Sequence, residues 1–454
     1  MPNEIDKLNR LACLFAPHAT LYAVGGFVRD GLLDCKSYDI DICSQLRVDD
    51  VKSILLNTEF AVSDKSLRMG TVHISADNFV AEYTTFRTDS YDGTSGNHAP
   101  DKVVFTDDIL KDALRRDFKC NAVYLDILKN QIVDPLGGID DINHRTLSTT
   151  DSPEAVFEAD GLRILRLVRF ASELGFDIEA DTWRVAKANA WRVKDIAAER
   201  IRDELCRIFI ADTAHPELKL KDAHLRGFRL LDELGLIDLL LPELASLKGL
   251  EQKKKYHLYD AYEHSVKAYE LSPPRLRWAA LLHDLGKRVA FDSNNGESMR
   301  GHDEIGAELA GKLLARLKFS NADRHRTVKI IRKHMVDLKG DTSFNKLRRF
   351  AVVNNDVIDD VCDIKDIDAE ASCGRKPEIN RVREAWQAVK RDGTPLSLRE
   401  LKVNGNDLME LGVESRDIGK MLEALFEDTV LNPDLNDRDK ALEYVRRKRN
   451  KLDK

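Results

Sequence analysis

The spacing of the apolar residues changes near Pro153, and this change constrains the fold more than any other feature of the sequence. Before it, short β-branched or alternating runs predict strands at 21–24, 39–43, 71–74, 79–85 and 121–125. After it, apolar residues recur three and four positions apart, as in Leu162, Leu165 and Val168, which predicts helices. We therefore expect an α/β (α+β) head with a small mixed sheet, followed by an all-α neck, body and tail.

Three breaks divide the chain. Pro153 fits the first turn of a helix, Pro273-Pro274 ends a helix, and the sequence DGTP at 392–395 predicts a loop before the last segment. Because 454 residues exceed one ordinary core, several domains are expected. The predicted domains are a catalytic head at 1–150, a helical neck at 151–215, a helical body at 216–391 and a helical tail at 392–454.

Composition favours a protein of the reducing cytoplasm without a membrane partner. The seven cysteines are odd in number and form no CxxC pair, so they indicate neither a disulfide framework nor a cysteine zinc site. Charges interrupt the first residues, unlike a signal peptide, and no run reaches the roughly 18 apolar residues of a membrane span. The net charge of -7 argues against uniform binding of a polyanion, so nucleic acid would have to contact local basic patches. Two candidates are KKK at 253–255 and RRKR at 446–449, and the alternative for each is a solvated surface without a partner.

A glycine pair and two aspartates predict a site for phosphate and metal in the head. Gly25 and Gly26 follow the first predicted strand and open a helix that carries Arg29 and Asp30, so backbone amides can approach a triphosphate. Further along, Asp39 and Asp41 alternate in a strand, which places both carboxylates on one face. Oxygen ligands arranged in this way suit Mg²⁺, and a pair of such ions can activate an attacking hydroxyl in phosphoryl transfer.

Further charged residues extend this site. Glu82 interrupts an apolar strand, either as a third catalytic carboxylate or as an exposed edge residue. The adjacent Arg115 and Arg116 could neutralise a triphosphate through forked hydrogen bonds, with Asp117 orienting one of them. The alternative for these three residues is a surface ion-pair cluster.

Histidines and aspartates in the helical part predict a second metal site. His264, the adjacent His283 and Asp284, and Asp368 offer nitrogen and oxygen ligands. Such a set suits a divalent transition metal (Mn, Ni or Fe) or Mg²⁺, and a metal-bound water can hydrolyse phosphoesters. A lone helical histidine is usually packed or exposed, so the prediction depends on the adjacent His-Asp pair with its flanking histidines. Two further histidines, His302 and His334, could hold a second ion.

Taken together, the head motifs resemble those of class II tRNA nucleotidyltransferases and bacterial poly(A) polymerases. The resemblance is ordered along the chain, and NGNDLMELG at 404–412 resembles the C-terminal segment of the bacterial members with a fused HD domain. The matching head and neck stretches are GGFVRD at 25–30, DID at 39–41, EYTTFR at 82–87, RRDFKCNA at 115–122, DPLGG at 134–138, ADGLRILRLVRF at 159–170 and ERIRDEL at 199–205.

This resemblance implies a template-independent enzyme that adds C and A from CTP and ATP to the 3′ end of tRNA. Asp39 and Asp41 match the aspartates that hold Mg²⁺ while the RNA 3′-hydroxyl attacks the α-phosphate and pyrophosphate leaves. Asp160 and Arg163 match the acid and arginine that read the incoming base. Cytosine and adenine both present an amino donor beside a ring-nitrogen acceptor, whereas uracil and guanine present the reverse order and leave both protein groups unpaired.

The predicted helix that carries Arg163 also places Arg166 and Arg169 along the same side. These arginines could track phosphates, or they could form the solvated face of an amphipathic helix. The resemblance supports a nucleotide-binding role for Arg163, and we extend that role to Arg166. In addition, the neck and the basic tail would contact tRNA through its shape and backbone.

Three departures from the family pattern bear on how many nucleotides are added. Ala159 stands where many members have glutamate, so part of the base-reading network is missing or supplied differently. Lys119-Cys120 replace the common Thr-Ile. The loop 89–102, which helps the family switch from C to A addition, lacks the arginine that often precedes its proline.

The helical ligand set resembles an HD phosphohydrolase domain, with His264, His283, Asp284 and Asp368 in the defining positions. Three alternatives to full CCA addition stay open. The chain could be a poly(A) polymerase, a partial enzyme that adds only the C residues or only the A, or an HD phosphohydrolase whose head binds RNA. Oligomeric state cannot be read from the sequence.

Overall fold

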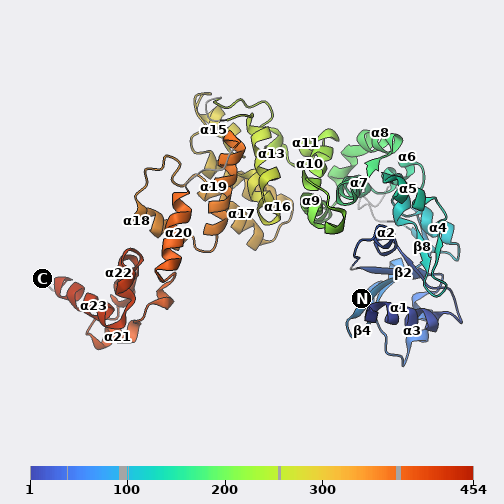
Figure 1. Cartoon of the computed structure of the whole chain (residues 1–454), viewed down its shortest axis with the longest axis horizontal. Coiled ribbons are helices and arrows are strands. Elements are labelled where there is room, and N and C mark those ends of the chain that lie inside the picture. Colours follow the sequence, from blue (N-terminus) through green and yellow to red (C-terminus); the bar gives the residue numbers. More distant parts are fainter. Residues whose placement is uncertain are drawn as a thin grey trace. The chain divides into compact units, whose positions relative to one another are not determined.

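The computed structural model describes residues 2–37, 39–90, 100, 102–253, 257–374 and 380–452. The chain divides into two compact units, Met1–Pro242 and Glu243–Lys454. In Figure 1 the first unit runs from blue to green and carries the strands, whereas the second runs from yellow to red and is drawn as helices. This arrangement confirms the predicted mixed head followed by helical regions.

The first unit begins with a mixed sheet of seven strands among the residues that the structure describes, in the order β3-β4-β5-β2-β1-β8-β9. The neighbours β2 and β5 run parallel, and the other neighbouring pairs are antiparallel. The strands are β1 (Tyr22–Val24), β2 (Ile40–Ser44), β3 (Ala61–Ser66), β4 (Thr71–Ala76), β5 (Phe79–Thr85), β8 (Tyr124–Asp126) and β9 (Gln131–Val133).

Four of the five predicted strands are confirmed, and the strand at 121–125 is wrong in its first half. There the chain forms a 3-10 turn, Lys119–Asn121, and β8 begins only at Tyr124. The Asn121 amide donates to Asp117 Oδ1 at 3.1 Å and its carbonyl oxygen accepts from Arg29 at 2.6 Å. These side-chain hydrogen bonds favour a turn over an extended strand at this position.

Apolar side chains place the sheet against helices α1 (Pro2–Phe15) and α3 (Val48–Leu55), which lie side by side in Figure 1. The ring of Phe15 is fully buried and its centroid lies 5.8 Å from that of Tyr83 in β5. Within β5, Phe79, Ala81 and Tyr83 are buried whereas Val80 is 57% exposed, which is the alternation that a strand with one covered face requires.

A separate hairpin, β6 (Arg87–Ser90) with β7 (Lys102–Phe105), extends from the sheet. Gly70 has a φ of +67°, and a Cβ there would lie 2.5 Å from the Phe105 ring, so only glycine allows this close approach. Most of the loop expected to switch nucleotide choice, residues 91–99 and 101, lies outside the described residues.

Helices follow the sheet from Pro153 onward, as predicted. Pro153 occupies the first turn of α6, where the Ser152 side chain accepts a hydrogen bond from the Ala155 amide and caps the helix. The remaining strands of this unit, β10 (Thr146–Leu147) and β11 (Asp177–Ile178), form a short parallel pair. The other helices are α2 (Gly26–Leu32), α4 (Ile109–Leu114), α5 (Gly138–His144), α6 (Pro153–Ala159), α7 (Leu162–Leu174), α8 (Ala180–Asn189), α9 (Ala198–Phe209), α10 (Ala223–Glu233), α11 (Leu236–Leu240) and, across the division, α12 (Pro242–Ala245).

Helices form all the regular secondary structure among the described residues of the second unit. As expected, α13 ends at Leu271 before the two prolines and α20 ends at Arg391 before the DGTP loop, whereas the four predicted domains remain a prediction. No described helix in either unit is long and apolar enough to cross a membrane. The helices are α13 (Ala261–Leu271), α14 (Arg277–Leu282), α15 (Lys287–Ser293), α16 (His302–Arg316), α17 (Asn321–Lys333), α18 (Phe344–Val353), α19 (Ile358–Cys373), α20 (Arg381–Arg391), α21 (Gly405–Glu410), α22 (Ile418–Leu431) and α23 (Arg438–Leu452).

Candidate functional site

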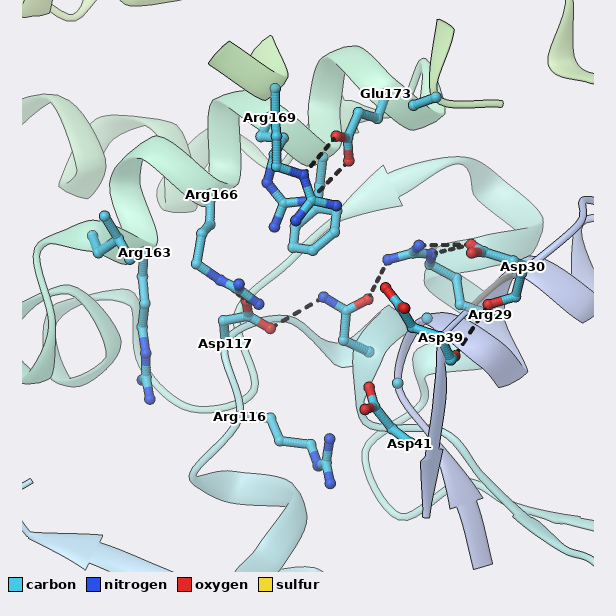
Figure 2. A pocket seen from close by; sticks show the side chains of 18 of the residues that line it. Arg29, Asp30, Asp39, Asp41, Arg116, Asp117, Arg163, Arg166, Arg169 and Glu173 are labelled. Carbon is cyan, nitrogen blue, oxygen red and sulfur yellow. Dashed lines mark hydrogen bonds and ion pairs between the residues drawn. The ribbon is translucent and has the colours of Figure 1, made fainter. Parts of the chain in front are cut away.

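A cavity of about 910 Å³ in the first unit brings together nearly all the residues predicted for the head site. Figure 2 shows Arg163, Arg166 and Arg169 extending from α7 on one side of it, with Asp39 and Asp41 on the other. Glu82 is not among its lining residues. The predicted residues that line the cavity are Gly25, Gly26, Arg29, Asp30, Asp39, Asp41, Arg115, Arg116, Asp117, Asp160, Arg163 and Arg166.

The two aspartates of the DID motif occupy different environments. Asp39 is exposed and immediately precedes β2, whereas Asp41 is half-buried within the strand. Gly25, at a φ of +75°, lies so close that a Cβ there would be 3.1 Å from Asp41 Oδ2. Burial, followed by the negative charge of Glu82, raises the pKa of the Asp41 carboxyl from 3.8 to about 6. A cation at this position would relieve the cost of keeping Asp41 ionised.

Glu82 lies opposite Asp41 in the register of β2 and β5 but forms contacts outside the cavity. Its carboxylate pairs with the Lys65 ammonium group and lies 3.9 Å from His73 Nε2. Glu82 therefore influences Asp41 through its charge, and a role for it as a metal ligand remains a prediction.

The adjacent arginines are held by an acid that the sequence interpretation missed. Asp112 in α4 is fully buried and accepts hydrogen bonds from Arg115 Nε at 2.8 Å and from Arg116 Nη2 at 3.1 Å. The Tyr124 hydroxyl donates to the same carboxylate at 2.8 Å. Burial opposes ionisation of Asp112, but the charges of Arg116 and Arg115 outweigh it and lower its pKa. Both arginines are thus positioned at the cavity wall by one carboxylate.

Asp117 does not orient either neighbouring arginine, so that prediction is wrong. Its Oδ2 instead accepts a hydrogen bond from Arg166 Nε of α7 at 2.7 Å, and its Oδ1 accepts from the Asn121 amide. The pKa of Asp117 is well below its ordinary value, because Arg166 and Asn121 outweigh the effect of burial. This pair ties the head loop to the helix that carries the predicted base-reading residues (Figure 2).

Asp160 and Arg163 both line the cavity, yet each is held by a different partner. Asp160 Oδ1 accepts from the Leu162 amide at 2.9 Å, and Oδ2 accepts from Arg200 Nη2 of α9 at 2.8 Å. Arg163 donates to the Arg115 carbonyl at 2.6 Å and to the Val156 carbonyl at 3.4 Å. Arg163 therefore hydrogen-bonds backbone carbonyl oxygens, whereas Asp160 accepts from a backbone amide and from Arg200.

Arg169 does not form a solvated face. It is 2% exposed, and it pairs with Glu204 at 2.6 Å and with Glu173 at 2.8 Å. This buried arrangement packs α7 against α9. Sequence interpretation also missed Arg200 and Arg207 of α9, which line the same cavity.

The second unit assembles the other predicted ligand set in its interior. His264 Nε2 lies 3.2 Å from His283 Nε2 and 3.0 Å from Asp368 Oδ1. The Asp284 carboxylate lies between two histidine pairs, because its Oδ2 is 3.1 Å from His283 Nε2 and its Oδ1 is 3.2 Å from His302 Nε2. His302 Nε2 in turn lies 3.4 Å from His334 Nε2. Two groups could each hold an ion: His264, His283 and Asp284, and Asp284, His302 and His334.

Backbone carbonyls orient three of these histidines. The Nδ1 atoms of His283, His302 and His334 lie 2.7, 2.9 and 2.6 Å from the carbonyl oxygens of the residues three positions earlier. An Nδ1 proton donated to a carbonyl leaves the Nε2 lone pair free for a metal ion. Burial opposes ionisation of Asp284, but the charges of His283 and Lys287 hold its pKa well below the usual range. The donor set therefore fits a divalent metal.

The described residues of the two basic patches predicted to bind nucleic acid do not line the cavity. Lys254 and Lys255 of the first basic patch lie outside the described residues, and the RRKR patch lies in α23. There, the Arg449 guanidinium donates to the Leu411 carbonyl, and Lys448 Nζ lies 3.7 Å from Asp428. Part of this basic tail therefore stabilises its own unit.

Comparison with known proteins identifies three consecutive regions. Residues 21–148 match the model "Poly A polymerase head domain", residues 175–248 match "Probable RNA and SrmB-binding site of polymerase A", and residues 254–372 match "HD domain". The first match includes the strands and turns that carry Asp39, Asp41 and the two adjacent arginines. The third includes all the residues of the histidine and aspartate cluster.

Curated relatives and a solved structure agree with these matches. The chain is 38% identical over 296 residues to an A-adding tRNA nucleotidyltransferase from Deinococcus radiodurans, covering 62% of this chain and 64% of that protein. It is 30% identical over 423 residues to a CC-adding tRNA nucleotidyltransferase from Thermus thermophilus, covering 89% and 88%. The Bacillus stearothermophilus CCA-adding enzyme in complex with CTP shares the fold, with a TM-score of 0.65, 22% identity and coverage of 100% and 99%.

Proposed function

The chain belongs to the class II tRNA nucleotidyltransferase and poly(A) polymerase family, and we propose that it adds C, A or both to the 3′ end of tRNA. The observation that carries this proposal is the cavity lined by Asp39, Asp41, the arginines and the two predicted base-reading residues, Asp160 just before α7 and Arg163 within it. CTP and ATP are the proposed donors. Addition proceeds without a nucleic-acid template, because protein side chains select the base.

The carboxylates and arginines of the head are the proposed binding groups for Mg²⁺ and the triphosphate. We assign Asp39 and Asp41 as the residues that hold Mg²⁺, which when bound activates the RNA 3′-hydroxyl and stabilises charge on the α-phosphate. Arg115 and Arg116, positioned by Asp112, neutralise the triphosphate and the departing pyrophosphate. Gly25 and Gly26 allow the phosphates to approach the backbone at the start of α2.

Asp160 and Arg163 select the base by hydrogen bonding. The amino group of cytosine or adenine donates to Asp160, and Arg163 donates to the adjacent ring nitrogen. A carboxylate has roughly four acceptor positions, so Asp160 can accept from an amino group while it stays bonded to Arg200 and Leu162. The Arg115 and Val156 carbonyls accept hydrogen bonds from Arg163, and we propose that they position it in this chain, which has Ala159 where many members have glutamate.

Incubation of the purified protein with Mg²⁺, labelled CTP or ATP, and three tRNAs tests the proposal. The tRNAs end before the CCA sequence, after its first C, or after its second C. Incorporation that stops after the terminal A supports a full CCA-adding enzyme, and incorporation at one stage alone supports a CC-adding or A-adding enzyme. A long A tail would indicate a poly(A) polymerase. Absence of incorporation with any tRNA would refute the transferase assignment.

A second activity is supported by the cluster around Asp284. Five buried side chains form two possible ligand groups that share Asp284, and Asp368 lies 3.0 Å from His264. Three Nδ1 atoms face carbonyl oxygens, which leaves their Nε2 atoms for metal. We infer that the second unit binds one or two divalent ions and hydrolyses phosphate esters. Metal analysis of the intact protein, followed by phosphatase assays with Mn²⁺, Ni²⁺, Fe²⁺ and Mg²⁺, tests this activity. A protein without bound metal and without hydrolysis under any of these ions would leave only a structural role.

The proposed function implies a cellular location and a set of RNA contacts. We propose a cytoplasmic location, where the reducing environment keeps cysteines such as the buried Cys43 and Cys120 as thiols. The neck helices and the basic part of α23 are the proposed tRNA contacts. Binding through phosphates should weaken steeply as salt is raised, so filter binding of tRNA at increasing salt measures this contribution.

A further inference from the structure

Phe170 is an aromatic residue of α7 whose surroundings the proposed function does not explain. It is 5% exposed, lines the cavity, and contacts the Phe118 ring edge-on at 5.8 Å between centroids. It ends the motif ADGLRILRLVRF, in which the roles above fall on Asp160, Arg163 and Arg166. A buried phenylalanine usually contributes packing alone.

Three guanidinium groups surround this ring. The central carbon of Arg169 lies 4.0 Å from the ring centroid, that of Arg29 lies 5.0 Å away, and that of Arg166 lies 5.3 Å away. All three distances are within the roughly 6 Å range of a cation–π contact. Arg29 comes from α2, whereas Arg166 and Arg169 come from α7. The ring is therefore a contact shared by the helix after the glycine pair and the base-reading helix.

Each of these arginines also has an acidic partner, so the ring is not needed to balance their charge. Arg29 bonds Asp30, Arg166 bonds Asp117, and Arg169 bonds Glu173 and Glu204. Hydrogen bonds lie in the plane of a guanidinium, whereas an aromatic ring packs on its face. A ring contact of this kind therefore restrains a guanidinium in a direction that its in-plane hydrogen bonds do not.

We propose that Phe170 is a positioning residue for triphosphate binding, which holds Arg29 and Arg166 in the orientation that receives the phosphates. This inference rests on the proposed function of the cavity. Arg169, paired with two glutamates, lies closest to the ring and holds it in place. Loss of the ring would leave the hydrogen bonds of Arg29 to Asp30 and Asn121 and that of Arg166 to Asp117, but it would remove the aromatic contact that limits tilting of both guanidinium groups away from the phosphates.

Phe170→Leu removes the ring and keeps an apolar side chain, and Phe170→Tyr keeps the ring. Phe15→Leu is the matched control, because Phe15 is also buried in a helix of this unit and also contacts another ring, Tyr83, at 5.8 Å. Melting temperatures establish that the variants fold, and Phe170→Met replaces Phe170→Leu if the latter does not. Isothermal titration calorimetry with Mg²⁺ then measures binding of CTP, ATP and inorganic triphosphate to the full chain without RNA.

The expected result is a rise in Kd of about tenfold for Phe170→Leu with all three ligands, against near wild-type values for Phe170→Tyr and Phe15→Leu. Equal Kd values for Phe170→Leu and Phe15→Leu at matched melting temperature would overturn the proposal, as would a failure of tyrosine to restore binding. If the wild-type protein binds inorganic triphosphate but neither nucleotide, the proposed function fails while the role of the ring is still measured. If it binds none of the three, both fail.

Discussion

Replacing Asp41 with asparagine should stabilise the metal-free protein above pH 6 while it abolishes nucleotide addition. Burial and the charge of Glu82 raise the Asp41 pKa from 3.8 to about 6, so the folded protein favours the protonated form. Below pH 3.8 the Asp41 carboxyl is mostly protonated in both the folded and the unfolded state. Between pH 3.8 and 6 the unfolded state ionises first, and above pH 6 the folded state bears the full cost of the charged carboxylate.

The structure gives the magnitude of this cost. A displacement from 3.8 to about 6, at about 1.36 kcal/mol per pH unit, corresponds to at most about 3 kcal/mol above pH 6. For a unit of 242 residues this is a rise of roughly 6 to 12 °C in melting temperature. Asparagine keeps the shape of the side chain and carries no charge, so Asp41→Asn should recover most of this stability at pH 8 and little of it at pH 4.

Differential scanning calorimetry of the full chain at pH 4 and pH 8, with chelator or with Mg²⁺, measures the effect. Mg²⁺ should raise the melting temperature of the first unit in the wild-type protein and have little effect on Asp41→Asn, because the ion binds the ionised carboxylate. Asp107→Asn, which removes an exposed carboxylate of the same head, is the control. A melting temperature of Asp41→Asn at or below the wild-type value at pH 8 would refute the reasoning.

Three other substitutions test the remaining contacts. Asp112→Ala should lower the free energy of unfolding by about 3–5 kcal/mol, because it leaves two buried arginine contacts without their acid, and urea denaturation measures this loss. Arg200→Ala should free Asp160 to pair with Arg163 and so reduce the preference for CTP and ATP over UTP and GTP by about tenfold in kcat/KM, whereas an unchanged preference would show that Arg200 does not position Asp160. His283→Ala should remove metal from the second unit without changing nucleotide addition, and retention of the wild-type metal content would contradict the proposed cluster.

The sequence predicted the chemistry of the head better than its internal contacts. The motifs identified Asp39, Asp41 and Gly25, and all three line one cavity. Asp39 lies just before β2 and not within a strand, and Gly25 meets Asp41 because β1 pairs with β2. Asp112 was missed, although it lies three and four residues before the two arginines in a helical stretch, which is the spacing of helical ion pairs. That spacing would have identified it once α4 was recognised as a helix.

Contacts between distant segments could not be predicted in the same way. Arg200 bonds Asp160 across 40 positions of sequence, and Phe170 meets Arg29 of a different helix. Neither pairing has a local signal, since both depend on how α7 packs against α9 and the head. The prediction that Asp117 orients a neighbouring arginine failed for the same reason, because Arg166 of α7 provides a stronger partner. In the second unit, the adjacent His283 and Asp284 gave a local signal that their packed surroundings now support.

Single-turnover transfer of labelled nucleotide to tRNA tests the central claim most directly. The measurement compares the wild-type protein with the Asp39→Ala, Asp41→Ala double variant and with His283→Ala, each with Mg²⁺ and a tRNA that lacks part of its CCA end. The account predicts rapid transfer by the wild-type protein and by His283→Ala, and none above background by the double variant. Transfer that survives loss of both aspartates, or that disappears with His283, would contradict it.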